Sequence, residues 1–140
     1  MAKIKKPKKR TVVCTGKRKT SIARATCKEG KGIVRINSLN LNLLTPETAR
    51  LRIMEPLILA GEKASKVNIS VNVSGGGVMS RADAARVAIS NALVNYFADS
   101  ELKKTFQMYD KKMLVSDTRR TEPQKPYRSA ARSKRQTSKR

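Results

Sequence analysis

The positive charge of this 140-residue chain is concentrated at its two ends. Residues 1–24 carry a net charge of +10 and residues 111–140 carry +9, whereas residues 25–110 carry only +3. Blocks of like charge with few apolar residues do not fold alone, because they repel themselves and bury little surface. The sequence therefore predicts one globular domain over residues 11–110, a basic N-terminal arm over 1–10 and an extended basic tail over 111–140.

The total charge of +22, from 32 Lys and Arg against 10 Asp and Glu, predicts a polyanionic partner. A charge of this size gains nothing for the fold, and phosphate groups would neutralise it. A purely solubilising role explains it less well, because acidic residues would serve solubility equally. Nucleic acid is therefore the expected partner.

The composition also excludes several classes of function. The chain has no His, the usual base for Ser or Cys catalysis, and Cys14 and Cys27 fit no metal-binding or disulfide spacing. We therefore expect no catalytic residue, no metal, no cofactor and no small-molecule substrate. The longest apolar run, residues 57–60, is far shorter than the roughly 18 residues of a membrane helix, so no membrane partner is expected.

Alternation of apolar and polar residues predicts the strands. From Val67 to Ser74, Val or Ile alternates with Asn or Ser, the period-two pattern of a strand with one buried face. Residues 21–28 alternate in the same way and are followed by turn residues and a short apolar run at 33–36, which together predict a β-hairpin. Residues 11–15 predict one further strand.

Helix signals complete the predicted fold. Thr45–Pro46 marks the start of one helix, which Pro56 is expected to end or bend. A capping box at Ser80–Asp83 predicts a long helix ending near Phe97, and residues 99–109 predict another. The element order predicts an α+β two-layer sandwich, with a mostly antiparallel four-stranded sheet and the helices on one face.

Two short segments are candidates for phosphate binding. A glycine turn between the clearest strand and the longest helix points backbone N–H groups and a helix dipole at an anion, although a tight structural turn explains it equally well. A run of three cations and two hydroxyls follows the first strand, and it is not a P-loop because the order of its residues is wrong. The candidate residues are Lys17, Arg18, Lys19, Thr20, Ser21, Gly75, Gly76 and Gly77.

The tail intersperses Lys and Arg with small polar residues, which lets an extended chain pass between RNA helices while Arg binds phosphate bidentately. The run Lys3–Arg10 fits either an RNA-binding arm or a nuclear import signal, since both depend on clustered charge. The candidate RNA-binding residues of the tail are Arg119, Arg120, Lys125, Arg128, Arg132, Lys134 and Arg135, with Lys139 and Arg140 at its end.

Five motifs in order resemble one family, the universal ninth protein of the small ribosomal subunit. The resemblance covers nearly the whole chain, and the fourth motif points to the archaeal and eukaryotic branch. The motifs are Thr15–Ala25, Ser74–Gly77, Ala82–Arg86, Asp117–Pro123 and Ser138–Arg140.

The resemblance implies a structural protein in the head of the small subunit of the cytoplasmic ribosome. Its implied partners are small-subunit rRNA, the peptidyl-site tRNA and neighbouring head proteins. It further implies that the tail runs through rRNA towards the peptidyl site, where Arg140, with Lys139 beside it, approaches the tRNA backbone.

Two other functions are weighed against this one. The glycine turn would suit a small-molecule kinase, but the sequence offers only the scattered carboxylates Asp83 and Asp99 as base and metal ligands. A nuclear nucleic-acid packaging protein would explain the basic ends but not the patterned strands and capped helix between them.

Overall fold

The computed structural model describes residues 10–135 and shows an α+β fold with a five-stranded mixed sheet. The strands lie in the order β1-β2-β5-β3-β4, and β3 pairs with β5 in parallel while the other neighbours are antiparallel. The prediction of four strands was wrong, because the structure has a fifth, the two-residue edge strand β4. The bounds are β1 (Thr11–Arg18), β2 (Ser21–Glu29), β3 (Val34–Ile36), β4 (Leu39–Asn40) and β5 (Val67–Ser74).

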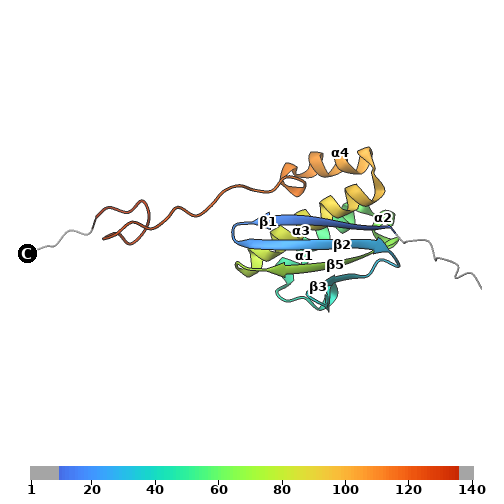
Figure 1. Ribbon diagram of the computed structural model, residues 1–140, viewed down its shortest axis with the longest axis horizontal. Helices are drawn as coiled ribbons and strands as arrows, with labels where there is room; N and C mark the ends of the chain where they lie inside the picture. Colours follow the sequence, from blue (N-terminus) through green and yellow to red (C-terminus); the bar gives the residue numbers. More distant parts are fainter. Residues whose placement is uncertain (1–9, 136–140) are drawn as a thin grey trace, which may run out of the picture.

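The helices pack on one side of the sheet, and in Figure 1 the strands lie in front of α1 and α3. No helix within residues 10–135 is long and apolar enough to cross a membrane. Short 3-10 turns occupy residues 41–43 and 111–113. The helix bounds are α1 (Glu47–Ala60), α2 (Glu62–Ser65), α3 (Val78–Phe97) and α4 (Ser100–Tyr109).

The predicted hairpin between residues 21–28 and 33–36 does not form, because β5 lies between these two strands. The true hairpin joins β1 to β2, with Arg18 opposite Ser21. Residues 29–33 instead cross the end of β5, where the Asn68 side chain accepts hydrogen bonds from the N–H groups of Lys31 and Ile33 at 2.9 and 3.0 Å. The glycine-rich link is therefore a crossover rather than a hairpin turn.

The structure decides two predicted helix boundaries. Pro56 does not end α1, because the helix continues through this buried proline to Ala60. Helix α3 begins at Val78 with Gly77 at its N-cap, so the Ser80–Asp83 capping box is not used. Its end at Phe97 and the helix over 100–109 agree with the sequence patterns.

The core lies between the sheet and α3 and is built largely from small residues. Ala23, Ala25 and Cys27 of β2 are fully buried, as are four alanines of α3. At Gly16 the helix backbone approaches so closely that a Cβ would lie 2.2 Å from the carbonyl oxygen of Ala84. Burial raises the pKa of the Cys27 thiol to about 11, with a smaller contribution from nearby Cys14, so Cys27 stays protonated at neutral pH.

Candidate nucleic-acid interface

The predicted basic run forms the tip of the β1–β2 hairpin. Lys17 is exposed near the end of β1, and Lys19 and Thr20 form the exposed two-residue turn. Lys19 has a φ of 51°, in the left-handed region that tight turns require. Two Lys side chains and one hydroxyl are thus presented to solvent at one end of the sheet.

The glycine turn lies directly against this hairpin tip, so the two candidate segments form a single site. A Cβ on Gly75 would lie 2.5 Å from the carbonyl oxygen of Thr20, and one on Gly76 would lie 2.1 Å from Ser21 Oγ. Ser21 is fully buried, and its hydroxyl donates a 2.9 Å hydrogen bond to the Gly75 carbonyl. We call residues 17–21 and 75–77 together the hairpin–glycine site.

The turn also places the start of α3 beside the hairpin. No side chain caps the first N–H groups of α3, and its N-terminal residues Val78 and Met79 are exposed. The Arg81 Nε donates a 3.0 Å hydrogen bond to the Gly75 carbonyl and so braces the turn from the helix side. The site therefore combines free backbone donors with Lys17 and Lys19.

Replacing Gly76 with Ala should destabilise the protein by at least ~1–2 kcal/mol, because φ is 64° there and the new methyl group would overlap Ser21 Oγ. Gly77→Ala is the matched control, since nothing lies within 4 Å of its Cβ position and φ is −87°. Its effect should stay within about 1 kcal/mol. Urea unfolding of both variants measures the difference, and equal stabilities would contradict the packing described for the turn.

Behind the hairpin, carboxylates fix the first residues of the tail. Asp117 lies 3.0 Å from the Arg18 guanidinium and accepts a 2.6 Å hydrogen bond from Arg119. Arg18 also lies 3.8 Å from Asp83, which accepts from Arg52 Nε at 3.1 Å. Hydrogen bonds from the Arg119 side chain and backbone hold the pKa of Asp117 well below its ordinary value, so this carboxylate stays ionised at neutral pH.

Arg86 is the buried centre of this ion cluster. It is 3% exposed, and it lies 2.8 Å from Asp110 and 2.6 Å from Glu55. Partial burial alone would raise the pKa of Asp110, but hydrogen bonds from Arg86 and the Lys112 backbone outweigh it and lower that pKa. The cluster therefore ties α3 to α1 and to the segment that follows α4.

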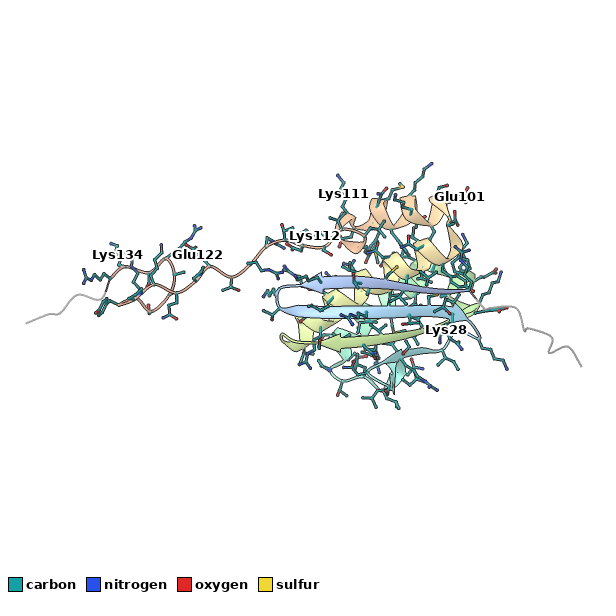
Figure 2. The ribbon with its side chains drawn as sticks, in the orientation of Figure 1. Lys28, Glu101, Lys111, Lys112, Glu122 and Lys134 are labelled. Atoms are coloured by element: carbon teal, nitrogen blue, oxygen red, sulfur yellow. The ribbon has the colours of Figure 1, made fainter. Side chains whose placement is uncertain are left out.

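Beyond the cluster the tail runs away from the domain without regular structure (Figure 1). Its carboxylate Glu122, labelled in Figure 2, pairs with Arg132 at 2.8 Å and with Lys125 at 3.9 Å. The guanidinium of Arg135 lies over the ring of Tyr127, 5.5 Å from its centre. All three pairs are exposed, so they contribute little and leave the cations accessible.

Most predicted site residues are exposed to solvent, but some of them are already paired with a carboxylate. Arg120 and Lys134 are exposed and Arg128 is partly exposed, whereas Arg18 and Arg119 face Asp117. Lys139 and Arg140 lie outside the described residues. No group of three or more His, Cys, Asp or Glu residues that could hold a metal ion occurs within 10–135.

Two sets of residues in and near the site carry no local sequence signal that identifies them. The first is the ion cluster, because its members come from distant segments and no local pattern joins them. The second is a group of outward-facing cations on the strands, Arg24, Lys28 and Arg35. The period-two alternation marked the outward positions, but the strand order that brings them together was not predicted.

Comparison with known proteins decides the family. The model of the family described as ribosomal protein S9/S16 matches residues 16–140. The chain belongs to the ribosomal protein S9/S16 family. Two relatives are named small ribosomal subunit protein uS9 and come from Methanococcus maripaludis strains C7 and C5. Each is 48% identical to this S9/S16-family chain over 131 residues, and the match covers 92% of the chain and 98% of the relative. A third, from strain S2, is 47% identical over the same length.

Membership of the S9/S16 family confirms the resemblance found from the five sequence motifs, and the relatives agree with an archaeal-type source. It also confirms that the chain is a ribosomal protein of the cytoplasmic ribosome and not an enzyme. The kinase and packaging alternatives are therefore set aside.

Proposed function

We propose that the chain is a structural constituent of the small ribosomal subunit that binds small-subunit rRNA in the head and supports translation. In this proposal its other partners are neighbouring head proteins and the peptidyl-site tRNA. Family membership supports the ribosomal role, and the charge and geometry of the chain support the RNA contacts.

The main support for this mode of RNA binding is that the β1–β2 hairpin and the start of the tail lie side by side at the end of β1. Lys17, Arg18, Lys112 and Arg119 line one hollow of about 120 Å³ at the end of β1, together with Asp83, Asp110 and Asp117. The exposed Lys17 and Lys112 therefore link the hairpin–glycine site to the start of the tail, while Arg18 and Arg119 are paired with Asp117. An rRNA backbone that contacts the hairpin would meet the tail cations next.

Within this proposal the globular domain and the tail have different tasks. Residues 11–110 dock as a preformed body, using Lys17, Lys19 and the first N–H groups of α3 on phosphates. Residues 111–140 follow the RNA, and phosphates displace Glu122 from its exposed partners because such pairs contribute at most about 1 kcal/mol. The tail residues proposed to contact rRNA are Arg119, Arg120, Lys125, Arg128, Arg132, Lys134 and Arg135.

Lys139 and Arg140 are proposed to contact the phosphate backbone of the peptidyl-site tRNA. A chain that ends at Ser138 should fold and enter subunits normally, while those subunits hold peptidyl-site tRNA roughly 3- to 30-fold less tightly, because two charge-assisted contacts are lost. Filter binding of tRNA to reconstituted subunits measures this. Lys103→Gln with Lys104→Gln, on the exposed side of α4, is a control of equal charge loss. Wild-type tRNA affinity after the truncation would refute the proposed contact.

A further inference from the structure

The face of the sheet opposite the helices has no cover within residues 10–135. On β2 and β5 the residues that alternate with the buried ones point away from the helices, and they are mostly polar. We call this surface the open face. Its outward residues on the three central strands are Ile22, Arg24, Thr26, Lys28, Asn68, Ser70, Asn72, Ser74 and Arg35.

Every charged side chain among these outward residues is basic. Arg24, Lys28 and Arg35 are all exposed, and none forms an ion pair or a side-chain hydrogen bond with any part of the chain that the structure describes. Most of the Arg side chains elsewhere in the globular domain are paired with carboxylates. The three cations thus share one surface whose outward residues on β2, β3 and β5 include no carboxylate.

The spacing of these cations follows from the strand register. Arg24 pairs with Asn72 of β5, and Lys28 pairs with Asn68, so the two cations lie about 13 Å apart along β2. Arg35 pairs with Ser70, between those two levels and two strands away from β2, about 12 Å from each. The backbone positions of the three cations thus form a triangle with sides of about 12–13 Å.

Short polar side chains lie between the three cations, and two shallow hollows lie against the cations. Thr26 and Ser70 lie opposite each other between the cations, and neither makes a side-chain hydrogen bond to another described residue. One hollow of about 350 Å³ lies against Lys28, Arg35 and Ser70, and a second of about 500 Å³ lies against Arg24. Free hydroxyls beside cations suit phosphate and sugar oxygens.

The outward positions of β1, β2, β3 and β5 carry no aromatic residue. This lack distinguishes between single-stranded and double-helical RNA as the partner. Sheets that bind single strands stack bases on aromatic side chains, whereas RNA double helices are bound by shape, through phosphates and 2′-hydroxyls. The open face offers cations, hydroxyls and amides but no stacking ring. Its chemistry therefore matches a duplex backbone.

We propose that the open face binds the sugar–phosphate backbone of an RNA double helix, as a contact separate from the hairpin–glycine site and the tail. This inference rests on the proposed function, because it adds a surface to the same rRNA-binding role. The domain would then hold RNA on the sheet surface as well as at the end of the sheet from which the tail leaves.

Lysine footprinting on the unaltered full chain tests the surface directly. An RNA duplex of about 20 base pairs, long enough to span a protein domain, should protect Lys28 from acetylation at least ~3-fold. Lys103 and Lys104, exposed on α4, are internal controls and should stay reactive. Lys28 lies on β2, well away from α4 in Figure 2, so the two sets report on different surfaces. Equal protection of all three would overturn the proposal.

Variants give a second test. The triple change Arg24→Gln, Lys28→Gln and Arg35→Gln should make the plot of log affinity for the duplex against log salt shallower by about 2, since each lost phosphate contact removes ~0.7–0.9. A control that loses the same charge is the set Lys66→Gln, Lys103→Gln and Lys104→Gln, all exposed and none of them on a strand. The control should change the slope by less than about 1, and equal slopes for the two variants would overturn the proposal.

The outcomes separate this inference from the proposed function. If the unaltered chain fails to bind small-subunit rRNA, the proposed function fails with it. If rRNA binding is normal but the open-face variant keeps its affinity for the duplex, only this inference fails. Loss of binding to a neighbouring head protein instead, with RNA affinity unchanged, would also overturn it by making the open face a protein-docking surface.

Discussion

Replacing Arg86 with Ala is expected to lower the free energy of unfolding by about 3–5 kcal/mol, the usual cost of removing one partner from a buried ion pair. Arg86 is 3% exposed and faces both Asp110 and Glu55. Without it, Asp110 loses the Arg86 ion pair and Glu55 keeps only the more exposed Arg52 as a partner. Urea denaturation followed by circular dichroism measures the change.

Arg52→Ala is the control for this prediction. Arg52 pairs with Glu55 and Asp83 in the same cluster, but its side chain is 40% exposed, so water replaces the lost contacts. Its loss should cost about 1 kcal/mol or less. Equal effects of the two substitutions would show that burial does not decide the strength of the cluster and would contradict the role given to Arg86.

Removing residues 118–140 is expected to weaken binding to small-subunit rRNA more than any substitution described above. The deletion removes nine Lys and Arg residues. If each contacts a phosphate, the dependence of log affinity on log salt should become shallower by up to ~6. The fold should persist, because the deleted residues that the structure describes are almost all exposed and Asp117 stays in place to pair with Arg18.

A full-length chain with residues 118–140 in shuffled order is the control for the deletion. It keeps the charge, so its salt dependence should match the original while its path through the RNA changes. Filter binding over a series of salt concentrations measures both variants. A deletion that leaves the salt dependence unchanged would contradict an RNA-binding tail, and one that unfolds the domain would contradict the separation of tail and globule.

Local patterns in the sequence were sufficient for most elements of the fold. Period-two alternation in residues 67–74 identified β5 and its buried face, and the apolar spacing before Phe97 identified α3. The pairing of strands was beyond such patterns. Glycines at 30 and 32 fit a hairpin locally, yet the segment crosses β5, because Val34 and Ile36 gain burial beside Ile69 and Val71 in the parallel pair. That choice depends on residues more than thirty positions away.

The candidate site was predictable only in part for the same reason. Charge density marked Lys17–Lys19, and glycine content marked Gly75–Gly77, but neither signal says that the two segments touch. Nor does composition reveal that Ser21 is committed to the Gly75 carbonyl. The placement of the tail beside the hairpin depends on Asp117 and Arg18, two residues 99 positions apart that the fold brings within 3.0 Å.

We propose that this S9/S16-family chain is a structural, RNA-bound component of the small ribosomal subunit. Sedimentation of cell extract through a gradient at high salt, with the chain followed by antibody, tests this proposal. The chain should travel with the small subunit, because the proposed contacts of the hairpin, the sheet and the tail would all have to break together for the chain to leave. Recovery at the top of the gradient, or with free nucleic acid instead of the small subunit, would contradict it.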